Sequence, residues 1–175
     1  QVSRHSAKAH NAVAGALTNQ VLNEPDEKKK KEMYAKALNH SKRAIQIHPT
    51  YANAFLIMGI CQYALNSFDD AIQSFQKALI LKPDFDEARH NLFLSYREAG
   101  KFYGEKRQDP NKALSLFKKA YALDATDSEL WRLTGIANGV LGNPEQAINW
   151  FKKILALNPD DAGALLNMSI SYRLL

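Results

Sequence analysis

The chain contains 175 residues, 46% of them hydrophobic, and carries a formal net charge of +5. A chain of this length and composition can bury a core, and we expect it to do so as one elongated domain rather than two. Its single cysteine, Cys61, excludes an internal disulfide framework, and we expect this thiol to be buried and structural.

One pattern of small and large residues recurs four times along the chain. The copies begin at Ala37, Ala71, Ala113 and Ala147, and the interval between the first two equals the interval between the last two. In the last three copies a phenylalanine follows the alanine by one helical turn. Small residues let two helices approach closely, and the phenylalanine fills the gap between them. A fixed period of about 34 residues indicates a stacked repeat architecture, which offers an extended surface to partners.

A second set of residues upstream of each alanine has the same period. It comprises Phe55, Met58 and Gly59, then Leu92, Phe93 and Tyr96, then Trp131, Thr134 and Gly135. Together with the Ala-x₃-Phe-x₂-Ala-x₄-Pro pattern, this set resembles the tetratricopeptide repeat, a helix–turn–helix unit of about 34 residues. The resemblance covers nearly the whole chain. It implies an all-α solenoid, a right-handed superhelix of antiparallel helix pairs with about four and a half repeats.

The resemblance assigns one tetratricopeptide domain to residues 1–175. Its repeats are 7–51, 52–85, 86–127, 128–161 and a partial fifth at 162–175. Repeats one and three are longer than the others, and their extra residues fall between the two helices, near 23–31 and 103–109. Both stretches are charged, so we expect solvated helix ends or loops there. Pro110 and Pro144 each follow a capping residue and suit the first position of a helix.

Two stretches of unusual charge have ordinary explanations. Residues 51–68 carry no charge, but they include polar residues and coincide with one repeat helix, so we interpret them as a buried solenoid helix rather than a membrane span. The lysines at 28–31 point all the way round a helix and follow Asp26 and Glu27 at its favourable amino end. We therefore disfavour nucleic acid as a partner, because the aromatic residues mostly occupy repeat-core positions instead of stacking sites.

The chain ends suggest a larger parent. The chain starts at a residue other than Met and stops after the first helix of the fifth repeat. That helix is apolar on several sides, whereas a terminal repeat normally presents a polar outer face. We expect a fragment of a longer protein. A cytoplasmic location is favoured, and an extracytoplasmic one follows if the parent is a membrane protein.

The sequence contains none of the common catalytic, phosphate-binding or metal-binding motifs. The chain has no glycine-rich phosphate loop, no Gly-x-Ser-x-Gly, no His-Glu-x-x-His and no Cys-x₂-Cys. Glu87 and His90 have a spacing used in metal-binding bundles, but the second pair that such a site requires is missing. We therefore predict no catalytic residue, no metal site and no cofactor, and we do not expect an enzyme.

The resemblance implies that the first helix of each repeat lines a concave groove. Leu56, Ile60, Leu94 and Ile136 recur at corresponding positions and would form an apolar floor, while Ile57 and Leu133 could equally pack on neighbouring repeats. The groove residues that we predict from these positions are Asn53, Leu56, Ile60, Tyr63, His90, Asn91, Leu94, Arg97, Arg132 and Ile136. Of these, His90, Arg97 and Arg132 would serve as polar anchors.

Two specialised grooves of the family do not match this pattern. Of the lysine, asparagine and arginine positions that clamp the carboxy-terminal carboxylate of chaperones, only Asn91 has a counterpart. The asparagine ladder of the repeats attached to protein O-glycosyltransferases is matched at Asn91 and Asn167 but interrupted at Ile57 and Leu133.

Three functional hypotheses remain. The first is a protein-interaction module that holds an extended or helical peptide segment of a partner in the concave groove. The second is the repeat region of a larger membrane-associated or glycosyltransferase protein, where it would position substrate for a separate catalytic domain; the opening residues 6–10 suggest it. The third is self-association through the carboxy-terminal helix at Leu166 and Ile170.

Overall fold

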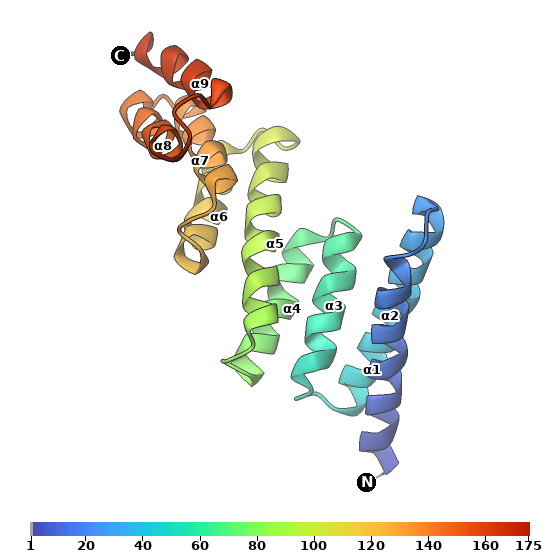
Figure 1. Ribbon diagram of the computed structural model, residues 1–175. Helices are drawn as coiled ribbons and strands as arrows, with labels where there is room; N and C mark the ends of the chain where they lie inside the picture. Colours follow the sequence, from blue (N-terminus) through green and yellow to red (C-terminus); the bar gives the residue numbers. More distant parts are fainter. Residues whose placement is uncertain (1) are drawn as a thin grey trace. The chain divides into compact units, whose positions relative to one another are not determined.

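The computed structural model describes the backbone of residues 2–175 and the side chains of residues 5–175. This part of the chain forms nine α-helices and no strand (Figure 1). The helices are α1 (Val2–Val21), α2 (Glu27–Ile47), α3 (Ala52–Ala64), α4 (Phe68–Leu81), α5 (Asp86–Glu105), α6 (Pro110–Leu123), α7 (Ser128–Val140), α8 (Pro144–Leu157) and α9 (Ala162–Tyr172). The predicted all-α fold is confirmed, while the assignment of residues 1–175 to one domain stays a prediction.

The helices group into two compact units, and the boundary lies inside α5 between Ser95 and Tyr96. In the first unit each helix from α1 to α4 packs on the next, and α1 also contacts α3. In the second unit α6 packs on α7, α7 on α8 and α8 on α9, while α7 also contacts α9. Each unit thus repeats one arrangement, in which the first helices of adjacent repeats touch one another.

The spacing of small residues and phenylalanines is explained by direct contact between the two helices of a repeat. Phe75 of α4 is fully buried and lies against Gly59 of α3, where an added Cβ atom would stand 2.6 Å from the ring. In the fourth repeat Phe151 of α8 meets Gly135 of α7 in the same way, at 2.7 Å. No real Cβ atom approaches a ring this closely, so only glycine fits.

The third repeat has the same contact between a phenylalanine and a glycine, but the glycine lies further along the first helix. The repeat pattern places Phe93 where the other copies have glycine, yet Phe117 of α6 lies against Gly100, two helical turns further on. Helix α5 has 20 residues where α3 and α7 have 13. The additional residues make two full turns, so the extra length returns the chain to the same face. The insertion of the third repeat is therefore mainly helical.

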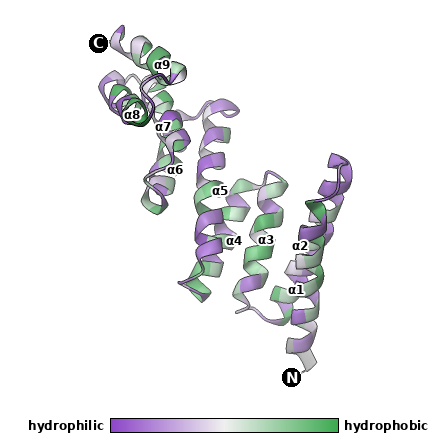
Figure 2. Cartoon of the chain, viewed as in Figure 1, coloured by the Kyte–Doolittle hydropathy of each residue, from purple (hydrophilic) through white to green (hydrophobic). Residues whose placement is uncertain are grey.

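The first repeat is lengthened in a similar manner. Helix α2 has 21 residues where the other second helices have 14. The carboxylate of Asp26 caps it and accepts hydrogen bonds from the backbone N–H groups of Lys28 and Lys29, at 2.8 and 3.2 Å. The lysine run thus lies in the first turns of α2, as predicted, and Figure 2 shows the hydrophilic character of the hairpin between α1 and α2.

The predicted helix starts at Pro110 and Pro144 are also found. The carboxylate of Asp109 accepts a hydrogen bond from the backbone N–H of Lys112 at 2.9 Å, so it caps α6. Asn143 occupies the capping position of α8, but its side chain makes no capping hydrogen bond. Proline suits the first helical position of α8 because its fixed φ is pre-organised for a helix and its missing N–H would have no partner there.

Helix α3 is packed inside the first unit, in agreement with its lack of charge. Cys61 is fully buried in a cluster with Ala14, Ala37 and Ile57, and burial raises the pKa of its thiol to about 12. None of the described helices combines the length and the apolar character needed to cross a membrane. Within the same described residues, no three histidine, cysteine or acidic side chains gather as metal ligands would.

Candidate partner-binding site

The predicted groove residues of α3 differ widely in exposure. Leu56 is only 3% exposed, so it belongs to the helix packing and cannot serve as a groove floor. Ile60 and Tyr63 are partly exposed, and Asn53 is exposed. Ile57, for which packing and ligand contact were both open, is 8% exposed and packs in the cluster around Cys61.

The predicted groove residues in the first half of α5 are exposed or partly exposed. His90 is exposed, and Asn91 and Leu94 are partly exposed. The side-chain amide of Asn91 donates a hydrogen bond to the carbonyl of Glu87 one turn earlier, at 2.8 Å. A carboxamide also carries an acceptor oxygen, so this side chain is suited to recognising a ligand's donor.

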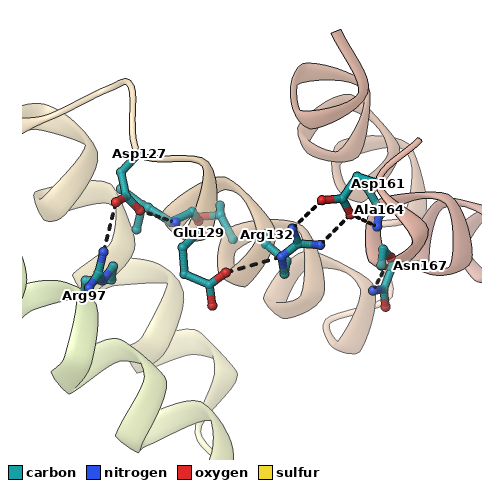
Figure 3. A network of polar contacts seen from close by, with 10 residues as sticks. Arg97, Asp127, Glu129, Arg132, Asp161, Ala164 and Asn167 are labelled. Atoms are coloured by element: carbon teal, nitrogen blue, oxygen red, sulfur yellow. Dashed lines mark hydrogen bonds and ion pairs between the residues drawn. The ribbon is translucent and has the colours of Figure 1, made fainter. Parts of the chain in front are cut away.

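The two predicted arginine anchors are engaged in ion pairs inside the second unit (Figure 3). Arg97 donates to Asp127 with Nη1 and Oδ2 2.9 Å apart. Arg132 donates through both terminal nitrogens to the two carboxylate oxygens of Asp161, at 3.0 and 2.9 Å. Planar, bidentate pairing of this kind is among the stronger charge-assisted contacts. Both guanidinium groups therefore form ion pairs within the second unit instead of standing free for a ligand.

Each of these aspartates has a second role at the start of a helix. Asp127 accepts a hydrogen bond from the backbone N–H of Leu130 and caps α7. Asp161 does the same for the N–H of Ala164, at 2.8 Å, and caps α9. The hydrogen bonds from Arg132 and Ala164 lower the pKa of Asp161 to about 2. Each ion pair therefore joins the first helix of one repeat to the residue that caps the first helix of the next repeat.

The repeat pattern assigns Arg97 and Arg132 to different positions, but the structure makes them equivalent. Each stands three residues before the glycine that contacts a phenylalanine, Gly100 or Gly135. The two extra turns of α5 account for the difference in numbering. The corresponding residue of α3 is the buried Leu56, so the second repeat has an apolar residue where the later repeats have an arginine.

A pocket opens between the first helices α7 and α9 of the second unit, with a volume of about 240 Å³. Its lining includes Ile136, Val140 and Ile170, which are 41%, 70% and 40% exposed. Gly139 adds open space, since an added Cβ atom would meet nothing within 4 Å. Asn167 brings a carboxamide whose nitrogen donates to the carbonyl of Gly163 at 2.8 Å.

Of the ten predicted site residues, Ile136 is the one that lines this pocket. The sequence pattern assigns Ile170 only to self-association, because it marks α9 as an end of the chain instead of a wall of the groove. A signal for the pocket is nevertheless present in the sequence: Ile170 stands one full repeat after Ile136. The geometry offers a small apolar recess with an amide at its side, which suits an aliphatic side chain next to a peptide bond.

A family model described as the cytochrome c-type biogenesis protein H TPR domain matches residues 3–164. The chain belongs to the tetratricopeptide repeat family. Tetratricopeptide repeats in general are protein-interaction scaffolds and are typically non-catalytic. The suspected family and the interaction-scaffold function in its general form are thereby confirmed.

Two tetratricopeptide relatives of the chain are much longer proteins. Human protein O-mannosyl-transferase TMTC3 is 28% identical over 159 residues, which cover 85% of this chain and 16% of the relative. The tetratricopeptide repeat-containing protein trd-1 of Caenorhabditis elegans is 25% identical over 125 residues, which cover 71% of this chain and 15% of the relative. The chain thus spans about a sixth of the length of these relatives.

Solved tetratricopeptide structures show the same fold. A MamA AMB-1 structure aligns with a TM-score of 0.60 at 18% identity and covers 98% of this chain and 81% of that one. YrrB, described as a TPR protein with an unusual peptide-binding site, aligns with a TM-score of 0.56 at 20% identity, over 81% of this chain and 69% of that one. At such low identity the likeness concerns the fold alone.

Proposed function

We propose that this tetratricopeptide chain binds a peptide segment of a partner protein on the concave side of its repeats, with the pocket between α7 and α9 as the principal anchor site. The observation that carries the proposal is the group of exposed aliphatic side chains around this pocket, Ile136, Val140 and Ile170. Exposed apolar residues gathered around a recess are typical of interaction surfaces.

Most of the affinity would come from a few anchors. A side chain of the partner that fills the recess would bury the surfaces of Ile136 and Ile170, and truncating such an anchor typically costs about 2 kcal/mol or more. The amide of Asn167 would bind the partner's backbone beside it. Specificity for an aliphatic residue follows, because a charged side chain in the recess would lose its hydration.

The first unit would contribute its own stretch of binding surface. The predicted residues that remain accessible there are Asn53, Ile60, Tyr63, His90, Asn91 and Leu94. Leu56 is omitted because it is buried, and Arg97 and Arg132 are proposed to act by fixing the first helices instead of binding the ligand directly.

The proposal is tested by a tagged pull-down from a lysate of the source cells, followed by binding of synthetic fragments of each captured protein. We expect Ile136→Glu, alone or with Leu94→Glu, to lose the partner while the far-ultraviolet circular dichroism stays unchanged. Leu157→Glu is the matched control, because Leu157 lies on α8, is 68% exposed and does not line the pocket. Equal capture by all variants would show that the concave side is not the working surface.

A second candidate function is supported by the similarity to TMTC3, a protein O-mannosyl-transferase. In this proposal the repeats belong to a larger enzyme, and the same groove positions a protein substrate for a catalytic domain elsewhere in the parent chain. The full reading frame of the parent decides between the two: a transferase domain would favour substrate positioning, and its absence would favour an independent adaptor.

A further inference from the structure

A second pocket lies in the same unit but on other helices. It has a volume of about 340 Å³ and is lined by residues of α6, α7 and α8, among them Lys118, Asn138, Asn149, Trp150 and Lys153. None of its lining residues belongs to the pocket between α7 and α9. A ligand here would therefore leave the proposed groove free.

The pocket is lined by a buried polar side chain with an unmade hydrogen bond. Asn138 is 2% exposed, and its amide nitrogen donates to the carbonyl of Thr134 at 2.8 Å. Its Oδ1 atom is buried and has no hydrogen-bond partner. Buried acceptors are nearly always satisfied, so an acceptor that the protein leaves unpaired beside a pocket is available to a hydrogen-bond donor that enters the pocket.

The corresponding place in the second repeat provides an internal comparison. A pocket of about 370 Å³ is lined there by Gln62, Asp70, Ser74 and Lys77. Two repeats later the same positions hold Asn138, Gln146, Trp150 and Lys153. The amide of Gln62 is hydrogen-bonded to the Ser74 hydroxyl at 2.5 Å, so that pocket satisfies its own polar group. In the fourth repeat Trp150 replaces this serine and leaves Asn138 without the equivalent partner.

A cation at the edge of the pocket is held in place by aromatic rings. The Lys153 ammonium lies 4.4 Å from the ring centre of Trp150, 5.1 Å from Tyr121 and 5.7 Å from Trp131. It also donates a hydrogen bond to the Tyr121 hydroxyl at 3.1 Å. Such contacts fix the ammonium before a ligand arrives, which reduces the entropy lost on binding.

The helices that carry the pocket's two lysines are basic in composition. The two second helices of this unit, α6 and α8, carry five exposed lysines and one acidic residue, Glu145. The lysines are Lys112, Lys118, Lys119, Lys152 and Lys153. The second helix of the second repeat, α4, instead carries two aspartates and one lysine. Two of the lysines on α6 and α8, Lys118 and Lys153, line the pocket whose polar group is unsatisfied, and their charge complements an acidic ligand.

We propose that the pocket between α6 and α8 binds an acidic peptide segment of a protein partner, separately from the groove on α7 and α9. Carboxylates of the segment pair with Lys118 and Lys153, an apolar side chain packs on Trp150, and a backbone N–H donates to Asn138 Oδ1. Since Oδ1 is covered from solvent, this donor reaches it by displacing one of the side chains that line the pocket.

The test measures binding of a fluorescein-labelled peptide of four Asp-Leu-Glu units to the full chain by fluorescence anisotropy. The comparison ligands are the same peptide with Asn and Gln in place of Asp and Glu, and a labelled oligothymidylate. We expect the acidic peptide to bind, the neutral one to bind at least about tenfold more weakly, and the affinity to fall as salt is raised.

Matched variants locate the site. Lys118→Gln with Lys153→Gln should weaken the acidic peptide about tenfold or more, whereas Lys42→Gln with Lys77→Gln, which removes the same charge elsewhere, should change its affinity less than about twofold. Ile136→Glu should leave it unchanged, so failure of the groove proposal and failure of this one are distinguishable. Absent binding, equal loss in both lysine pairs, or tighter binding of the oligothymidylate would overturn the proposal.

Discussion

Substituting alanine at two glycines of α7 should have opposite effects on stability. A Cβ atom at Gly135 would lie 2.7 Å from the ring of Phe151, which is 1% exposed and has no room to retreat. At Gly139, one turn later in the same helix, a Cβ atom would meet nothing within 4 Å. We expect Gly135→Ala to destabilise the fold and Gly139→Ala to stabilise it.

The magnitudes follow from two competing terms. Alanine gains about 1 kcal/mol over glycine in a helix interior; this gain applies in full at Gly135 and in part at Gly139, which lies in the last turn of α7. Forcing an extra carbon into a packed core costs about 1–3 kcal/mol, and at a contact this short the upper part of that range applies at Gly135. The net change in the free energy of unfolding is a loss of about 1–2 kcal/mol for Gly135→Ala and a gain of up to about 1 kcal/mol for Gly139→Ala.

Urea unfolding followed by circular dichroism at 222 nm measures both changes. The double variant Gly135→Ala with Phe151→Leu serves as the control, because a smaller side chain at position 151 should recover part of the loss caused by the alanine. Stabilisation by Gly135→Ala equal to that by Gly139→Ala would refute the close contact between α7 and α8.

Three further predictions concern other parts of the chain. Because the pKa of Asp161 is lowered to about 2, its pairing with Arg132 should add stability above the unfolded-state pKa of about 4 that is lost as the pH falls toward 2; urea midpoints between pH 6 and pH 2 should show this loss, and Arg132→Met should reduce it. Cys61, with its pKa raised to about 12, should react with iodoacetamide at pH 8 far more slowly in the folded chain than in urea, and rapid labelling of the folded chain would contradict its burial. If α9 serves self-association instead of peptide binding, its exposed residues Leu166 and Ile170 should support a dimer at micromolar concentration, which light scattering would detect and which Leu166→Glu with Ile170→Glu should dissociate; a monomer for the unchanged chain would exclude this alternative.

The repeat architecture could be predicted from the sequence because its signals are local. The alanine and phenylalanine spacing marks one helix–helix contact, and prolines after capping residues mark helix starts such as Pro110. The contact made by the lengthened α5 could not be predicted in this way. Gly100 has no place in the repeat pattern, and only its contact with Phe117 shows its role. A fixed period cannot show by itself where an inserted segment is absorbed.

The candidate site could be predicted less well from the sequence pattern. Leu56 fits an apolar groove position by pattern, but its burial depends on neighbours that the pattern does not specify. Arg97 and Arg132 are predicted to be ligand anchors from their groove positions. The ion pairs that engage them are missed because Asp127 and Asp161 lie about 30 residues away, just before the next first helix. Charge pairing over that separation follows from the stacking of repeats and not from any motif within one of them.

The length of α5 also suggests a rule for enlarging solenoids of this kind. Successive residues of an α-helix are rotated by about 100°, so an insertion of two full turns returns a side chain to within about 20° of its original direction. An insertion of five residues would instead turn it by about 140° and point Gly100 away from Phe117. Insertions in repeat helices should therefore be tolerated in whole turns, and a designer could lengthen one arm of such a scaffold without redesigning its core.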